Sequence, residues 1–286
     1  MSIAYVFPNV LRSRGKFSHR CEYARAVGCS YVEIPAHFVR GKKELGKTGQ
    51  EIYSIPTRES IRFLYGEETI PEDPLPYILH TEAIIKRKSE GSRGKKPHLL
   101  WSNPQWRENF VAMLCDIAEV IGSPAAKIEI HPGERNEISP KDILDSVEFI
   151  ISQYTRITGS EPEILLENRT GQRVKDGTDI KGLWNLCEEK YPQLQNKFGI
   201  VLDVSQLLTV TEDNFLRSFA EIPDPCLKGF HIHYQHHPPS SSDLIPWNVV
   251  FARIGNLRQD IIINPEIHHK KPVRNAIDFC KEMLAK

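Results

Sequence analysis

Short apolar segments alternate with longer amphipathic segments along the chain. The apolar segments are rich in Ile, Leu and Val, and most of them lack a regular alternation of polar and apolar residues. Continuous apolar runs of this length are typical of parallel strands that are covered on both faces. The pattern predicts eight strands, over Ile3–Phe7, Tyr31–Pro35, Tyr77–His80, Lys127–His131, Glu163–Glu167, Gly199–Asp203, Gly229–His233 and Ile261–Glu266.

The segments between these strands carry apolar residues at helical spacing. Ser139 followed by Pro140 is a favourable helix start, because serine caps free N–H groups and proline fits the first turn. The pattern predicts helices over Phe17–Val27, Gln105–Ile121, Pro140–Thr155, Thr178–Tyr191, Glu212–Glu221 and Pro272–Ala285.

Strands that alternate with helices form a parallel sheet, and eight such units favour closure into a TIM barrel. A doubly wound open sheet is the alternative, but the chain has no G-x-G-x-x-G fingerprint and no phosphate-binding P-loop. No linker rich in Pro, Gly or Ser divides the chain. We therefore expect an α/β protein with a single (β/α)8 TIM barrel over residues 1–286.

Composition excludes several classes of protein. A hydrophobic content of 40% excludes intrinsic disorder, and 37 basic against 37 acidic residues exclude a surface coated in one charge. No apolar run reaches the roughly 18 residues of a membrane helix, and the first residues do not resemble a signal peptide. The six cysteines contain no C-x-x-C pair. We expect free cysteines, a cytoplasmic protein and no membrane partner.

Candidate metal ligands lie where the predicted strands end. Functional residues of a TIM barrel gather at this end of the strands, and six consecutive strands here end in a histidine or a carboxylate. Imidazoles and carboxylates together suit zinc, manganese or a related divalent ion. Six ligands are more than one ion needs, so two ions that share a carboxylate, about 3.5–4 Å apart, fit better. The residues are His80, His131, Glu167, Asp203, His231 and Glu266.

Some of these positions have other interpretations. A single histidine or aspartate at a strand end is more often a hydrogen-bonding group than a ligand. The register of His80 is the least constrained, because prolines precede its strand. His233 competes with His231 for the same role, and Glu33 could face the mouth, although a salt bridge is its simpler role.

Three segments around these positions carry a family resemblance. Residues 128–133 read Ile-Glu-Ile-His-Pro-Gly, residues 166–172 read Leu-Glu-Asn-Arg-Thr-Gly-Gln, and residues 202–206 read Leu-Asp-Val-Ser-Gln. These segments, with the later His231 and Glu266 positions, resemble the xylose isomerase-like TIM barrel superfamily. Within it, they are most similar to the endonuclease IV branch of apurinic/apyrimidinic endonucleases (family 2). The likeness covers roughly residues 77–267.

The resemblance implies a metal-dependent hydrolase. One ion would be held by His80, His131 and Glu167, and a second by Glu167, Asp203, His231 and Glu266, with Glu167 as the bridge. Zinc is the expected ion, and manganese is the alternative. Such an enzyme hydrolyses a phosphodiester of the DNA backbone at abasic or damaged sites, with a metal-activated water that Glu167 or Glu266 helps to orient.

The chain departs from that family at a third metal site. The family has a histidine where this chain has Gln206, and an Asp-x-His pair where Asp243 is followed by Ile245. His236 and His237 are near enough in sequence to substitute. We therefore do not extend the resemblance to a third ion.

Two other functions remain open. Sugar isomerases and epimerases of the same superfamily use one ion on a Glu, Asp, His, Glu quartet, which Glu167, Asp203, His231 and Glu266 could equally supply. His80 and His131 would then contact the substrate or stabilise the barrel. A barrel that binds nucleic acid without catalysis would hold no stoichiometric metal.

Basic residues are concentrated after the first three predicted strands. Residues 86–96 alone carry six basic residues and one acidic residue. Basic loops at the mouth would give a positive field that suits a phosphate backbone, although charged loops usually only interact with solvent. Trp101 and Trp106 could stack on a base, although packing is the commoner role. We expect DNA contacts from Arg12, Arg14, Lys42, Lys43, Lys86, Arg87, Lys88, Arg93, Lys95 and Lys96. The sequence leaves the oligomeric state open.

Overall fold

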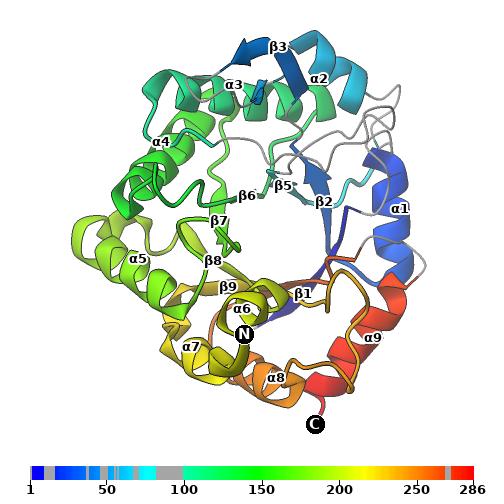
Figure 1. Cartoon of the computed structure of the whole chain (residues 1–286). Coiled ribbons are helices and arrows are strands. Elements are labelled where there is room, and N and C mark those ends of the chain that lie inside the picture. Colours follow the sequence, from blue (N-terminus) through cyan, green and yellow to red (C-terminus); the bar gives the residue numbers. More distant parts are fainter. Residues whose placement is uncertain are drawn as a thin grey trace.

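A closed barrel of eight parallel strands forms the centre of the molecule, and helices surround it (Figure 1). The computed structural model describes residues 2–9, 17–36, 39–45, 51–54, 56, 58–66, 71–81, 99–267 and 272–286. The strand order around the barrel is β1-β10-β9-β8-β7-β6-β5-β2, so neighbouring barrel strands follow one another in the chain. The expected (β/α)8 TIM barrel is confirmed.

All eight predicted strands occur in the barrel. They are β1 (Ile3–Phe7), β2 (Tyr31–Pro35), β5 (Tyr77–His80), β6 (Lys127–Ile130), β7 (Glu163–Glu167), β8 (Phe198–Asp203), β9 (Leu227–His231) and β10 (Ile261–Asn264). An antiparallel pair that the sequence did not predict, β3 (Val39–Leu45) and β4 (Glu51–Ser54), follows β2.

The helices also agree with most of the predicted ranges. They are α1 (Phe17–Val27), α2 (Arg58–Tyr65), α3 (Pro104–Ile121), α4 (Pro140–Thr158), α5 (Gly177–Lys190), α6 (Val204–Thr211), α7 (Phe215–Glu221), α8 (Trp247–Asn256) and α9 (Val273–Leu284). The predictions missed α2, α6 and α8. The helix expected from Glu212 begins only at Phe215, because residues 212–214 form a 3-10 turn.

Capping residues fix where α4 starts and ends. The Ser139 hydroxyl accepts a hydrogen bond from the Asp142 N–H, and the Asp142 carboxylate accepts one from the Ser139 N–H. Such reciprocal capping satisfies N–H groups that the first turn leaves free. Gly159 ends the helix with φ +74°, a conformation that favours glycine.

The barrel interior consists of an apolar layer below a polar layer. Alternate side chains of a barrel strand point inward, so residues two apart lie above one another. The apolar layer is formed by Val6, Ile78, Leu165, Val201 and Ile262. Two residues further along four of these strands, the buried inward residues are His80, Glu167, Asp203 and Asn264. The polar layer therefore lies at the carboxyl ends of the strands, directly above the apolar layer.

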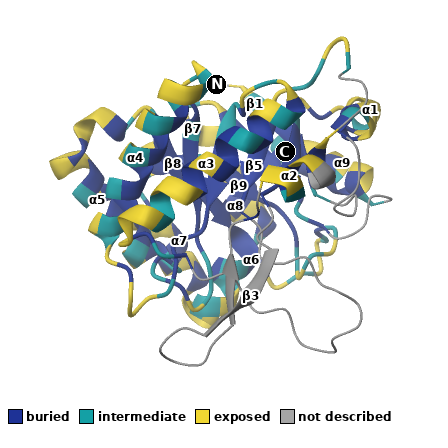
Figure 2. Cartoon of the chain, turned by 90° about the horizontal axis from the view of Figure 1, so that it is seen from above, coloured by how far each residue is buried: buried dark blue, intermediate teal, exposed yellow. Residues whose placement is uncertain are grey.

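The buried faces of the helices cover the outside of the barrel, and their exposed faces point to solvent (Figure 2). All six cysteines are buried and free, as expected. None of the helices in the described part of the chain is long and apolar enough to cross a membrane.

Candidate metal centre

The six expected ligands converge at one mouth of the barrel. Ligand atoms of His80, His131 and Glu167 all lie within 4.8 Å of one another. The same holds for Glu167, Asp203, His231 and Glu266, so Glu167 belongs to both groups. All six are buried except Glu266, whose side chain is 16% exposed. The strand ends thus bring together the side chains that the sequence singled out.

The first group has three ligand atoms that face one another. Nε2 of His131 lies 2.7 Å from Oε2 of Glu167, and Nε2 of His80 lies 3.3 Å from the same oxygen. Burial, together with the Arg169 cation, lowers the pKa of His131 to about 4. Burial alone would raise the pKa of Glu167, but Arg169 and His131 hold it well below its usual range. Near neutral pH these two groups therefore have the protonation states that bind metals.

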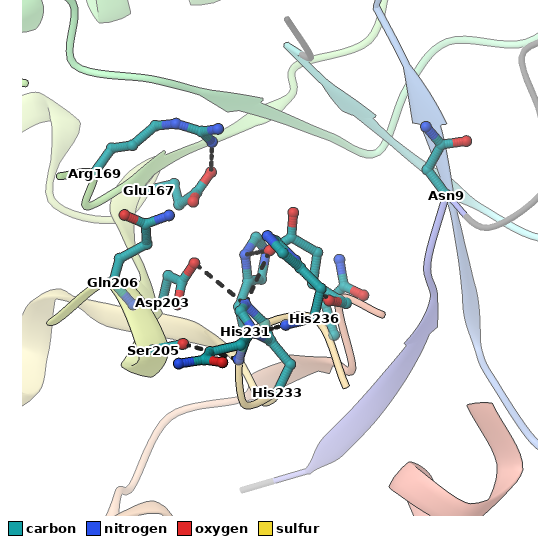
Figure 3. Close-up of polar contacts among 12 residues, drawn as sticks. Asn9, Glu167, Arg169, Asp203, Ser205, Gln206, His231, His233 and His236 are labelled. Carbon is teal, nitrogen blue, oxygen red and sulfur yellow. Dashed lines mark hydrogen bonds and ion pairs between the residues drawn. The ribbon is translucent and has the colours of Figure 1, made fainter. Parts of the chain in front are cut away.

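Arg169 is a site residue that the sequence analysis missed. Its Nη1 lies 3.0 Å from Nε2 of His131 and 3.4 Å from Oε2 of Glu167, as Figure 3 shows for the carboxylate. A guanidinium only donates hydrogen bonds, so Nε2 of His131 is the acceptor. The lone pair that would bind an ion therefore points at Arg169. The available signal was its position two residues after Glu167, within the segment that carries the resemblance.

The second group contains polar atoms that lack partners. Glu167 Oε1, Glu266 Oε2 and both ring nitrogens of His231 are buried without a hydrogen bond. Buried polar atoms are costly when unpaired, and a cation that binds between the carboxylates and the imidazole could supply the missing partner. Glu33 and Glu129 add two more buried carboxylates to the mouth. This excess of negative charge and the mixed N/O ligand set fit divalent ions such as zinc or manganese.

Glu33 forms the salt bridge that the sequence favoured, with a partner inside the mouth. Its Oε1 lies 2.9 Å from Nδ1 of His80, and its Oε2 accepts a hydrogen bond from the Asn264 side chain at 2.8 Å. These contacts place His80, whose register the sequence left least constrained, firmly in the polar layer.

Glu129 is the second residue that the sequence analysis missed. Its Oε1 lies 3.0 Å from Nε2 of His231 and 3.5 Å from Nε2 of His80. Burial lowers the pKa values of these two histidines, but Glu129 is the main influence that raises both well above the usual range. The signal was present in the sequence, since Glu129 precedes His131 by two residues and therefore shares its inward face.

His233 and His236 form a third group with Glu266. Residues Gln235 and His236 have positive φ angles of 50° and 60°, and this tight turn directs the His236 N–H at Nδ1 of His233, 3.1 Å away. Nε2 of His233 lies 3.4 Å from Asp203 (Figure 3). The same nitrogen lies 3.2 Å from Glu266.

His233 acts as a hydrogen-bond donor at the mouth. Because Nδ1 accepts the amide hydrogen bond, the neutral ring carries its proton on Nε2. Although burial lowers it, the pKa of His233 is raised to about 10 by Asp203 and Glu266. The His236 N–H, which donates to Nδ1, disfavours a second proton on that nitrogen. Nε2 carries a proton in both the neutral and the protonated ring. His233 therefore donates a hydrogen bond to Asp203 and forms an ion pair with Glu266.

The other positions considered for a third ion have structural contacts. The Gln206 side chain accepts a hydrogen bond from the Thr170 N–H at 3.1 Å. The Asp243 carboxylate accepts from the Ser240 N–H at 2.7 Å and from the Trp247 indole at 2.9 Å. The contacts of Gln206 and Asp243 hold loops in place.

The stacking interpretation of the tryptophans is wrong for Trp101, which is fully buried and donates from its indole to the His131 carbonyl at 3.0 Å. Trp106 packs on Phe110 and Trp101. Among the expected DNA contacts, Lys42 and Lys43 lie on β3, where the structure describes the backbone alone. The other expected contacts lie outside the described residues: Arg12, Arg14, Lys86, Arg87, Lys88, Arg93, Lys95 and Lys96.

Two side-chain amides connect the loops that carry the ligands. Asn168 exchanges two hydrogen bonds with the backbone of Asp203, at 2.7 and 3.2 Å. The Gln172 side chain accepts from the Gly133 N–H at 3.0 Å, two residues after His131. The ends of β6, β7 and β8 are therefore linked side by side.

Searches of protein-family models and of curated proteins give no match. Solved structures that resemble the chain include a family 2 AP endonuclease from Brucella melitensis (TM-score 0.59, 9% identity, 98% of each chain covered). A xylose isomerase domain-containing protein from Salmonella typhimurium has a TM-score of 0.58 at 12% identity, over 99% of this chain and 97% of its own.

A D-allulose 3-epimerase from Methylomonas sp. has a TM-score of 0.57 at 13% identity, over 99% of this chain and 98% of its own. Likeness at these identities is likeness of fold, and the three proteins differ in the activities their names describe. The chain therefore shares the TIM-barrel fold of these proteins.

Proposed function

We propose that this chain is a divalent-metal-dependent phosphodiesterase that works with two ions, zinc in the first instance. The observation that carries the proposal is the position of Glu167, which belongs to both ligand groups. A carboxylate shared by two groups suits a pair of ions about 3.5–4 Å apart, the arrangement used in phosphoryl hydrolysis.

The residues of the mouth have distinct roles in this proposal. Bound ions would supply an activated water and balance the charge on the attacking and leaving oxygens. Glu167 and Glu266 help to orient the water, and Glu266 is the more accessible of the two. Arg169, 21% exposed, can donate to the phosphate oxygens of a substrate that enters the mouth. The apolar layer excludes water from below.

We extend the proposal to the DNA backbone, at abasic or damaged sites. Its support is the basic sequence of residues 86–96, which follows the strand that ends in His80. A basic segment that follows a candidate ligand in the sequence suits a polyanionic substrate. The likeness of fold to an AP endonuclease is compatible with this substrate.

Metal analysis coupled to a cleavage assay tests the proposal. Zinc-loaded protein should contain two ions per chain and should cleave a duplex with one abasic site. The Glu167→Gln variant should keep the fold, lose cleavage and hold less metal, because the bridging group loses its charge at nearly constant volume. A variant that keeps full metal content and turnover would show that Glu167 is not a bridge. If the wild-type protein binds no metal, both enzyme functions are excluded, and a barrel that binds nucleic acid without catalysis remains.

A single-metal sugar isomerase or epimerase is the second candidate, and Arg169 is the observation that favours it. The guanidinium contacts His131 and Glu167 at the position that the first ion would take. If Arg169 stays there, the quartet of Glu167, Asp203, His231 and Glu266 holds one ion, and Arg169 binds the substrate. One ion per chain, with turnover of a keto sugar and none of abasic DNA, would support this function instead.

A further inference from the structure

Glu33 and Glu129 are buried in the mouth but belong to neither ligand group. They come from β2 and β6, the strands on either side of β5, which carries His80. A buried carboxylate needs a partner, because the charged form is costly to desolvate. In both cases the nearest ionisable partner is a histidine of the metal centre.

Glu33 holds one side of the His80 ring. Oε1 of Glu33 lies 2.9 Å from Nδ1 of His80. Oε2 accepts hydrogen bonds from the Asn264 side chain at 2.8 Å and from the Asn9 N–H at 3.2 Å. The carboxylate is thus fixed in place and acts as an acceptor, so Nδ1 of His80 carries a proton. Nε2 then faces the first group, and any proton on it is the one that an ion would replace.

Glu129 has the opposite relation to His231. Oε1 of Glu129 lies 3.0 Å from Nε2 of His231 as an ion pair, and neither atom forms a hydrogen bond with any other group. Nδ1 of His231 faces the second group and lies 3.3 Å from Oε2 of Glu266. The ring therefore presents Nε2 to Glu129 and Nδ1 to the position of the second ion.

We propose that Glu33 and Glu129 are positioning residues that select opposite tautomers of two ligands. Glu33 keeps the proton of His80 on Nδ1, which leaves Nε2 for the first ion. Glu129 keeps the proton of His231 on Nε2, which leaves Nδ1 for the second ion. A carboxylate on the far nitrogen fixes the ring and increases its basicity, and its loss typically costs about 10- to 100-fold in metal affinity. The inference rests on the two-ion centre proposed above.

The tautomers can be measured without a variant. Long-range ¹H–¹⁵N spectra of zinc-loaded wild-type protein distinguish a protonated ring nitrogen from a metal-bound one. His80 should be protonated at Nδ1 and bound through Nε2, whereas His231 should be protonated at Nε2 and bound through Nδ1. Binding of both histidines through the same nitrogen would overturn the inference and would leave the two-ion proposal intact.

Site-specific affinities provide the second measurement. Calorimetric titration of demetallated protein with zinc should show that Glu33→Gln weakens one of the two sites about 10- to 100-fold and changes the other little. Glu129→Gln should weaken the other site. The control is Glu163→Gln, at the start of β7 and paired with Lys127, which should leave both affinities unchanged. Wild-type affinities in both test variants would refute the positioning role, whereas absence of zinc binding in the wild type would refute the proposed function.

Discussion

Replacing Arg169 by methionine should strengthen the binding of the first ion. In the structure the guanidinium donates to His131 at 3.0 Å and approaches Glu167 at 3.4 Å. An ion that binds these two ligands must displace the guanidinium. Methionine has a similar length but neither charge nor donors, so the displacement no longer opposes binding.

The size of the effect follows from these contacts. A hydrogen bond that involves a charged group contributes about 1.5–3 kcal/mol. The contact with His131 is well formed, whereas the contact with Glu167 is long. We therefore count one such hydrogen bond, rather than two, as the cost of displacing the guanidinium. At about 1.4 kcal/mol for each factor of ten, the affinity for the first ion should rise about 10- to 100-fold.

The titration should be made at pH 7.5. Burial first, and Arg169 second, lower the pKa of His131 to about 4. Without the cation this pKa moves up toward its ordinary value, so protons compete better with the ion at pH 5–6. At pH 7.5 proton competition is weaker than at pH 5–6, so the comparison reports mainly on the guanidinium.

Calorimetric titration of demetallated protein with Zn²⁺ or Mn²⁺ would measure the change. Arg217→Met is the control, because Arg217 is 82% exposed on α7 and pairs only weakly with Glu221 at 3.5 Å. The control should leave both affinities unchanged. An unchanged or weaker first site in Arg169→Met would show that the guanidinium does not occupy the ion's position.

The remaining predictions concern stability and substrate. Excess chelator should lower the melting temperature of the loaded protein, since ions at 100 times their Kd add about 2.7 kcal/mol to the native state; a melting curve unaffected by chelator would contradict the metal centre. Gly177→Ala should destabilise the fold by about 1–3 kcal/mol in urea, because its Cβ would lie 1.9 Å from the Ser218 carbonyl. Gly182→Ala, in the same helix with nothing within 4 Å, should instead stabilise it by about 0.5–1 kcal/mol. Serine at Lys86, Arg87, Lys88, Arg93, Lys95 and Lys96 should flatten the salt dependence of DNA binding by about 0.9 per lost phosphate contact. An unchanged slope would remove the main support for DNA as substrate.

The barrel could be predicted because its strands are continuous apolar runs that end in polar residues at regular intervals. The short helix α6 was missed because it begins directly after β8, where the Asp203 side chain caps it by accepting from the Gln206 N–H. A residue judged only as a candidate ligand gives no sign that it also starts a helix.

The ligands could be predicted for the same reason, but their partners could not. Glu33 and Glu129 have the same inward parity as the ligands, yet a glutamate inside a strand is also compatible with an edge or a surface ion pair. Arg169 is harder still, because an arginine after a strand usually points to solvent. Its contact with His131 depends on the path of the loop after β7, which the sequence pattern does not determine.

The side-chain amides that join the strand ends have a consequence for interpreting sequences. Asn168 and Gln172 are part of the segment that makes this chain recognisable, yet they bond to backbone, at Asp203 and Gly133. These hydrogen bonds fix the loops that carry His131, Glu167 and Asp203 relative to one another. Neither amide lies among the candidate ligands. Any reaction that needs these ligands at fixed distances needs the same hydrogen bonds between the loops. Such a segment therefore indicates how the candidate ligands are held, and the substrate must be inferred from other side chains of the mouth, such as Arg169.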